Sequence, residues 1–121
     1  MVANTTQRAH WAFFSASMPQ TQVQQYTERF NDESYLVFLD MLLFALPRVK
    51  KINTPMLVVA GATDTLFSVE EERRTALTYG AQFHNFDDVA HDMMLEDNWE
   101  SVAESMLNWL DNVSSKVPAD K

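Results

Sequence analysis

Asp64 is a residue in this 121-residue sequence whose type and position suggest chemistry. It ends the stretch PMLVVAGATD, residues 55–64, in which an apolar run stops at a glycine. A run of this length between a proline and a glycine is typical of a strand buried on both faces of a parallel sheet. Functional groups of open α/β sheets lie beyond the carboxyl ends of strands, so a catalytic carboxylate is expected here. The alternative is that Asp64 only caps a turn.

More ionisable residues gather in the segment HNFDDVAHDMMLED. They are His84, Asp87, Asp88, His91, Asp92, Glu96 and Asp97. One interpretation is a metal site made of two histidines and two carboxylates, since the adjacent His91 and Asp92 are similar to a pair found in metal-dependent phosphohydrolases. Such sites take their ligands from helical faces at fixed spacings, whereas this segment is typical of strand and loop.

The other interpretation pairs Asp64 with His91, which follows the next predicted strand. Adjacent parallel strands lie about 5 Å apart, so the loops at their carboxyl ends can bring an acid within hydrogen-bonding reach of a histidine. A carboxylate that orients an imidazole, so that the ring takes a proton from a nucleophile, forms two thirds of a hydrolytic triad.

A strand–helix–strand unit is needed to position this pair. The sequence predicts a strand over 56–60, a helix over about 69–79 and a weaker strand over 81–86. Ser68 and Glu71 fit a capping box at the start of the helix, and Gly80 fits its end. This order of elements predicts a parallel, right-handed crossover.

Helices are predicted on both sides of this unit. Residues 1–10 are expected to be polar and disordered, and the aromatic cluster at 11–14 to be extended or irregular. Helices are predicted over about 19–31 and 34–46, the second being apolar on nearly every side. A last helix is expected from about Asp97, with an apolar stripe made of Trp99, Val102, Ala103, Met106, Leu107 and Leu110. A polar tail covers 114–121.

The overall composition excludes several functions. The net charge of −8 repels nucleic acid and anionic lipid, and no basic patch offsets it. The absence of cysteine excludes disulfides and thiolate metal sites. The N-terminus lacks a signal-peptide pattern, and the longest apolar run, residues 35–46, is short for a membrane span. A cytoplasmic protein with no cofactor, no nucleic acid and no membrane partner is expected.

The run TPMLVVAGATD, the capped helix and the segment AHDMMLEDNWESVAESMLNWL together resemble the C-terminal part of the α/β-hydrolase fold family. The resemblance implies that Asp64 is the catalytic acid and His91 the general base. It also implies that residues 11–47 form a helical lid and 48–113 a partial α/β-hydrolase subdomain. In the lid, Phe38, Met41 and Phe44 would line an apolar substrate pocket, and the substrate would be an ester, lactone or similar acyl compound.

This chain departs from the family at the nucleophile. Members carry a G-x-S-x-G elbow, but Gly61 and Gly80 are the only glycines here and neither flanks a serine at that spacing. The glycine-rich oxyanion motif and about five preceding strands are also missing. The serines at 15, 17, 34 and 68 are better suited to caps and loops. We therefore expect a serine-type hydrolase portion that is inactive alone; the alternative is a non-catalytic, self-associating remnant or interaction module.

Partners follow from the missing strands. The strand over 56–60 would have an unpaired edge, and the apolar helix over 34–46 would lack the surface that it covers. We expect a homodimer through the edge strand, the lid helix or both, or a complex with an N-terminal hydrolase fragment that supplies the nucleophile.

Overall fold

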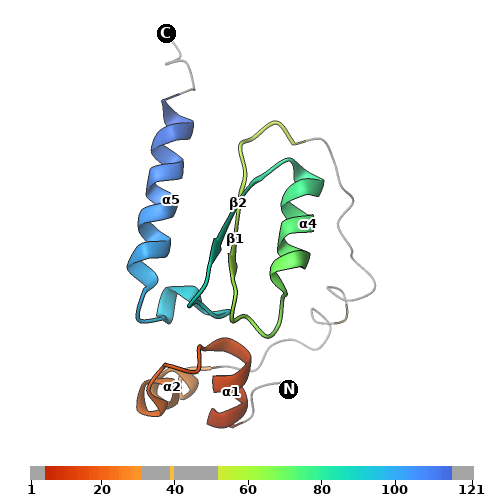
Figure 1. The fold of residues 1–121 in the computed structure, drawn as a ribbon. Coiled ribbons are helices and arrows are strands. Elements are labelled where there is room, and N and C mark those ends of the chain that lie inside the picture. Colours follow the sequence, from red (N-terminus) through yellow and green to blue (C-terminus); the bar gives the residue numbers. More distant parts are fainter. Residues whose placement is uncertain (1–4, 31–38, 40–51, 116–121) are drawn as a thin grey trace.

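The computed structural model describes residues 5–30, 39 and 52–115, and these form a small mixed α/β arrangement (Figure 1). The elements in chain order are α1 (Thr6–Phe13), α2 (Gln20–Thr27), β1 (Leu57–Gly61), α4 (Val69–Tyr79), β2 (Gln82–Phe86), the 3₁₀ helix η2 (Met93–Leu95) and α5 (Trp99–Ser114). The predicted α/β class is confirmed in this coarse form. The predicted helix over 34–46 lies outside the described residues.

The two strands form a parallel pair, as predicted, and each begins and ends within one residue of its predicted bounds. Leu57 of β1 lies opposite Gln82 of β2, and Gly61 lies opposite Phe86. In Figure 1 the sheet stands between α4 and α5. Successive side chains of a strand point to opposite faces, so α4 and α5 meet different residues of β2. On the α4 side, the guanidinium of Arg73 lies 4.5 Å from the centroid of the Phe83 ring.

The capping box and the terminal glycine predicted for α4 are both present in the structure. The Ser68 hydroxyl accepts a hydrogen bond from the Glu71 backbone N–H, and the Glu71 carboxylate accepts one from the Ser68 backbone N–H, which completes the capping box. The hydrogen bonds from the Ser68 side chain and backbone lower the pKa of Glu71. Gly80 ends the helix in the left-handed region, at φ 65°, where a residue without a Cβ is favoured.

The N-terminal segment differs from the prediction. Residues 6–10 were expected to be disordered and 11–14 irregular, but α1 spans Thr6–Phe13, so both expectations are wrong over this helix. The Thr5 side chain caps the helix by accepting from the Arg8 backbone N–H, and Ala9 and Ala12 are buried. A helix of eight residues has little stability by itself. Its stability comes from packing against α2, and the local sequence pattern gives no sign of that packing.

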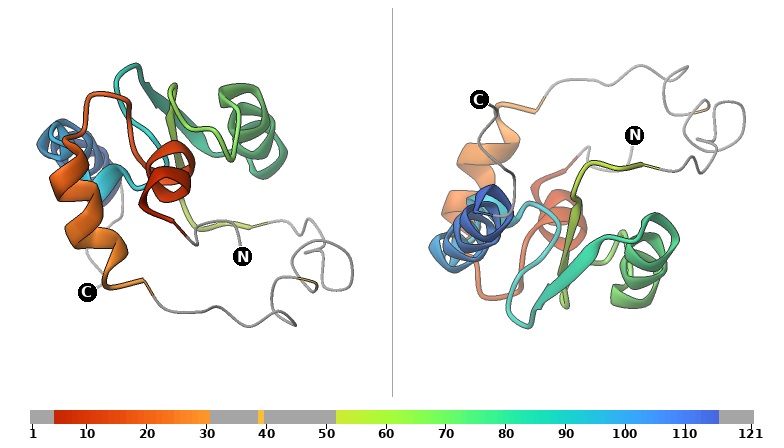
Figure 2. Two further views of the ribbon diagram at one scale, coloured as in Figure 1. Left: turned by 90° about the horizontal axis from the view of Figure 1, so that it is seen from below. Right: turned by 90° about the horizontal axis from the view of Figure 1, so that it is seen from above.

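α2 confirms the predicted helix after Pro19, although it ends at Thr27. It contributes Val23 to a small core with Phe14 and Met18, and Leu95 of η2 packs against that core. The α1–α2 pair lies across the carboxyl ends of the two strands (Figures 1 and 2). This places the N-terminal helices directly beside the loops that carry Asp64 and His91.

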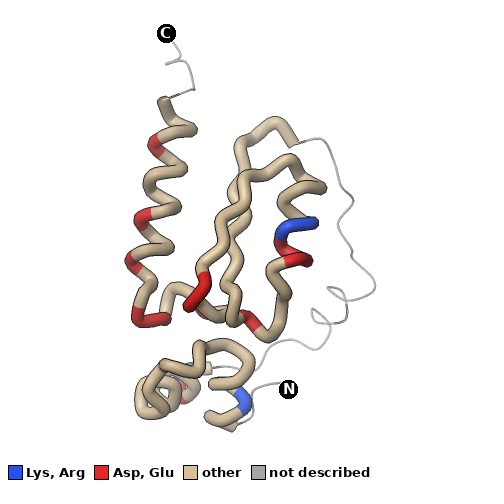
Figure 3. Tube along the Cα trace, viewed as in Figure 1, with Lys and Arg blue, Asp and Glu red and all other residues tan. Residues whose placement is uncertain are grey.

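α5 confirms the last predicted helix, but little of its apolar stripe is buried. Val102 is the buried residue of this helix. The large apolar side chains that stay exposed on it are those of Trp99, Met106, Leu107 and Leu110. Acidic residues are distributed along the length of α5 (Figure 3). Within the described part of the chain, every helix is too short or too polar to span a membrane.

Candidate active site

Asp64 and His91 lie side by side at the carboxyl end of the sheet. The Nδ1 atom of His91 is 2.9 Å from Oδ2 of Asp64. The Asp64 side chain is 7% exposed and that of His91 is 30% exposed. The pairing that the sequence suggested is therefore present in the structure, with the carboxylate enclosed and the imidazole reaching the surface.

The loop after β1 holds the Asp64 carboxylate in place. Its Oδ1 atom accepts hydrogen bonds from the backbone N–H groups of Leu66, at 2.7 Å, and Phe67, at 3.1 Å. Oδ2 is thus left for the imidazole. A carboxylate that accepts several hydrogen bonds is fixed in orientation. Asp64 does make the turn suggested by the simpler interpretation, and it also faces a histidine.

The loop before His91 packs directly on the end of β1. The backbone N–H of Thr63 donates to the carbonyl oxygen of Val89 at 3.1 Å, and both Val89 and Ala90 are buried. A Cβ atom added to Gly61 would lie 2.3 Å from that same oxygen. Glycine is required at this position because the two backbones approach so closely.

Two aromatic rings flank the imidazole. The ring centroid of Phe13, at the end of α1, is 5.8 Å from that of His91, and the centroid of Phe67 is 5.6 Å from it. No hydrogen bond joins the Nε2 atom of His91 to any other described residue. This nitrogen is available to an incoming group.

Asp92 and Glu96 connect the histidine loop to the N-terminal helices. The backbone N–H of Asp92 donates to the carbonyl of Phe13 at 2.9 Å. Burial raises the pKa of the Asp92 carboxyl; the nearby charges of Glu96 and Asp64 add to this effect and that of His91 opposes it. Glu96 is buried and accepts from the backbone N–H and the hydroxyl of Ser15, both at 2.6 Å.

The sequence did not indicate this use of Glu96 and Ser15. Glu96 stood among possible metal ligands and Ser15 among loop residues, and the two are 81 positions apart. The signal that was available is that Glu96 directly follows three apolar residues, Met93, Met94 and Leu95, close to a helix start. A charged residue next to an apolar run must find buried partners if that run packs into the protein.

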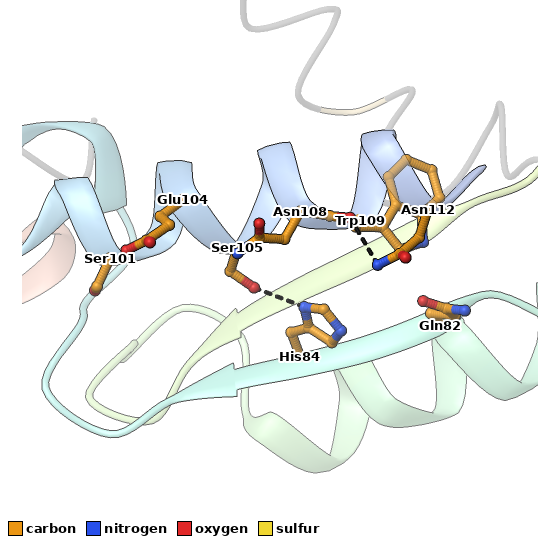
Figure 4. Close-up of a pocket in the computed structure, with 8 residues that line it drawn as sticks. All are labelled: Gln82, His84, Ser101, Glu104, Ser105, Asn108, Trp109 and Asn112. Carbon is orange, nitrogen blue, oxygen red and sulfur yellow. Dashed lines mark hydrogen bonds between the residues drawn. The ribbon is translucent and has the colours of Figure 1, made fainter. Parts of the chain in front are cut away.

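The ionisable residues considered in the alternative metal interpretation are not grouped around a common point. Among the described residues, no group of three or more histidine, aspartate or glutamate side chains is arranged to hold a metal ion. His84 lies on β2, and its Nδ1 atom is 2.8 Å from the hydroxyl oxygen of Ser105 on α5 (Figure 4). It faces an open groove of about 350 Å³ lined by Gln82, His84, Ser101, Glu104, Ser105, Asn108, Trp109 and Asn112.

The predicted substrate-binding residues Phe38, Met41 and Phe44 lie outside the described residues. A second hollow, of about 400 Å³, lies between α1 and the loop that carries Asp64. Most of the surface that lines it is apolar, although several of the residues are polar. The lining residues are Gln7, His10, Trp11, Phe14, Ala16, Thr63 and Thr65. Thr63 and Thr65 are the chain neighbours of Asp64 on either side, so this hollow borders the candidate site.

Comparisons of the chain with protein-family models, curated proteins and solved structures found no match. Function is therefore inferred from the site itself. A fixed carboxylate, an imidazole hydrogen-bonded to it through Nδ1, and an Nε2 atom without a hydrogen bond to another described residue are the parts of a unit that can accept a proton.

Proposed function

We propose that Asp64 and His91 are the acid and the general base of a serine-type hydrolase of the α/β-hydrolase kind, acting on an ester, lactone or similar acyl substrate. The observation that carries this proposal is the 2.9 Å contact between Oδ2 of Asp64 and Nδ1 of His91, while Nε2 has no hydrogen bond to another described residue. The position of both residues beyond the carboxyl ends of parallel strands supports it.

The chemistry follows from this arrangement. Asp64 accepts a hydrogen bond from Nδ1–H of His91, so the free lone pair of the neutral ring lies on Nε2. A nucleophile hydroxyl placed at Nε2 gives its proton to the ring as it attacks the acyl carbon. The imidazolium that forms is stabilised by the Asp64 carboxylate, which stays ionised. General-base assistance of this kind contributes about 10²–10⁴-fold in rate.

The nucleophile is proposed to come from a different polypeptide segment. Among the described serines, Ser15 donates its hydroxyl hydrogen to Glu96 and Ser68 caps α4. None of the described serines is hydrogen-bonded to His91. We propose that an N-terminal hydrolase fragment, carrying the core strands and a G-x-S-x-G elbow, supplies the serine and the oxyanion hole.

A chimeric enzyme tests this function. This chain is fused after the core strands and serine elbow of an active α/β-hydrolase esterase, in place of the esterase's own lid and C-terminal segment. The chimera is expected to hydrolyse p-nitrophenyl butyrate and to be labelled at its serine by a fluorophosphonate. His91→Ala and Asp64→Asn should each lower kcat by about 10²–10⁴-fold.

His84→Ala is the matched control, because it removes an imidazole that faces Ser105 and not Asp64. This variant should keep the activity of the parent chimera. A chimera that melts cooperatively but shows no hydrolysis, or shows equal hydrolysis with and without His91, contradicts the proposal.

The second candidate function is that of a non-catalytic, self-associating module, and the outer face of α5 favours it. The apolar side chains exposed there are those of Trp99, Met106, Leu107 and Leu110. Burying one large apolar side chain is worth roughly 1.5–3 kcal/mol. A dimer in which a second copy covers this face would therefore be stabilised. The edge of β1 that pairs with no other described strand and the predicted helix over 34–46 are the other proposed contact regions of a homodimer.

Sedimentation of the chain at micromolar concentration tests this second candidate. The expected species is a dimer that Leu107→Gln weakens. Leu77→Gln is the control, because Leu77 is an equally apolar and even more exposed residue on α4. A stable, well-folded wild-type monomer would refute self-association.

A further inference from the structure

Phe67 is an exposed aromatic residue with a defined neighbour. Its residue surface is 47% exposed, so it gains little from burial in a core. Its ring centroid nevertheless lies 5.6 Å from that of His91, with the planes at 43°. Core packing does not explain this position, whereas contact with the imidazole does.

Phe13 holds a similar position on α1. Its ring centroid is 5.8 Å from that of His91, with the planes at 48°. The Phe30 ring, after α2, packs edge-on against Phe13 at 5.5 Å. Two aromatic rings from segments far apart in the sequence therefore contact the same imidazole.

Each of these rings is tied through its backbone to one side of the acid–histidine pair. The N–H of Phe67 donates to Oδ1 of Asp64 at 3.1 Å. The carbonyl of Phe13 accepts from the N–H of Asp92, the residue after His91, at 2.9 Å. The rings and the pair are thus parts of one hydrogen-bonded unit.

The α1–α2 segment is fastened to both loops of the site by further bonds. On the acid side, the Thr65 hydroxyl donates to the Trp11 carbonyl at 2.8 Å. On the histidine side, the Ser15 backbone N–H and hydroxyl both donate to Glu96 at 2.6 Å. These contacts fix the end of α1, and with it Phe13, relative to the imidazole.

We propose that Phe13 and Phe67 are positioning residues that hold the His91 ring with Nδ1 toward Asp64 and Nε2 outward. The torsion that turns an imidazole on its Cβ is broad and nearly two-fold, so the covalent structure alone does not select this orientation. A half-turn keeps the ring plane but would place a carbon atom opposite Asp64, so the hydrogen bond to Asp64 selects between these two positions. The contacts with Phe13 and Phe67 restrict the plane itself, and each favours that plane over a rotated one by roughly 2- to 12-fold. The catalytic consequence of this positioning rests on the proposed function, whereas the positioning itself does not.

The chain itself provides the first test, through ¹⁵N NMR of the assigned His91 ring at pH 8. The wild type should show one tautomer, with the proton on Nδ1. Phe67→Ala should bring in the second tautomer or exchange broadening of the ring signals. Phe67→Tyr should restore the wild-type spectrum, because it keeps the ring, while Phe67→Leu should not. Phe83→Ala is the matched control, since Phe83 contacts Arg73 on α4.

Phe13→Ala should likewise bring in the second tautomer or exchange broadening of the His91 signals. If this variant fails to fold, Phe67→Ala still tests the proposal. A folded Phe67→Ala protein with the wild-type tautomer and line width overturns the proposal. In the esterase chimera, Phe67→Ala should lower kcat about tenfold with KM nearly unchanged. A change in the tautomer combined with a folded but inactive parent chimera would uphold the positioning and refute the proposed function.

Discussion

Replacing Gly61 with alanine tests how the end of β1 supports the candidate site. The new Cβ atom would lie 2.3 Å from the Val89 carbonyl oxygen, 2.8 Å from the Val89 carbonyl carbon and 3.0 Å from the Ala90 oxygen. All three are backbone atoms of buried residues, so rotation of a side chain cannot relieve the contact. The histidine loop must move by about 1 Å to reach an ordinary carbon–oxygen separation.

The cost has two parts. Overpacking in a closely packed region costs about 1–3 kcal/mol. The same movement stretches the hydrogen bond from Thr63 N–H to the Val89 carbonyl, now 3.1 Å, which is worth about 1 kcal/mol. The free energy of unfolding should fall by about 2–4 kcal/mol, and the Tm by roughly 8–16 °C for a domain of this size.

Gly80→Ala is the control for this experiment. Its Cβ atom would meet no heavy atom within 4 Å, but the φ of 65° is unfavourable for alanine. It should cost about 1–2 kcal/mol and leave the site unchanged. Urea and thermal unfolding measure both stabilities, and ¹⁵N NMR of His91 reports the Asp64 contact. Only Gly61→Ala should disturb that contact. If Gly61→Ala were no less stable than Gly80→Ala and kept the wild-type His91 signals, the close approach inferred for β1 and the histidine loop would be wrong.

Three further predictions concern the support of the site and of α4. Ser15→Ala removes a 2.6 Å hydrogen bond to buried Glu96, so the free energy of unfolding in urea should fall by about 1.5–3 kcal/mol; an unchanged midpoint would contradict this. Burial raises the pKa of Asp92, so the native state keeps this proton to higher pH than the unfolded chain and stability falls as pH rises through that interval. Asp92→Asn should therefore raise the Tm more at pH 7 than at pH 3, and an equal shift at both pH values would speak against a buried carboxylate. Ser68→Ala removes the cap of α4 and should cost about 1 kcal/mol in chemical denaturation, with no change in the His91 NMR signals.

The strand–helix–strand unit could be read from the sequence because its signals are local. An apolar run ending at Gly61, the capping box of Ser68 and Glu71, and Gly80 in the left-handed region each act over a few residues. Parallel pairing then brings the ends of consecutive strands together, so the closeness of Asp64 and His91 also follows from the chain order.

The N-terminal helix could not be read in this way. α1 has eight residues with little apolar character, and it is stable because Ala9 and Ala12 pack against the rest of the protein. The buried contact between Ser15 and Glu96 joins positions 81 apart, and no short-range pattern indicates such a partner. Sequence alone therefore did not indicate the structural role of Glu96.

The sequence by itself determined which residues form the strands, the capped helix and the acid–histidine pair, because capping, glycine conformation and strand periodicity depend on neighbouring residues. Only the tertiary structure decided what surrounds that pair. The rings of Phe13 and Phe67 contact the imidazole of His91. The carboxylate of Glu96 accepts a hydrogen bond from the Ser15 backbone. These contacts join segments that are distant in the chain, and their free energy comes from burial and hydrogen bonding that exist only once those segments have packed together.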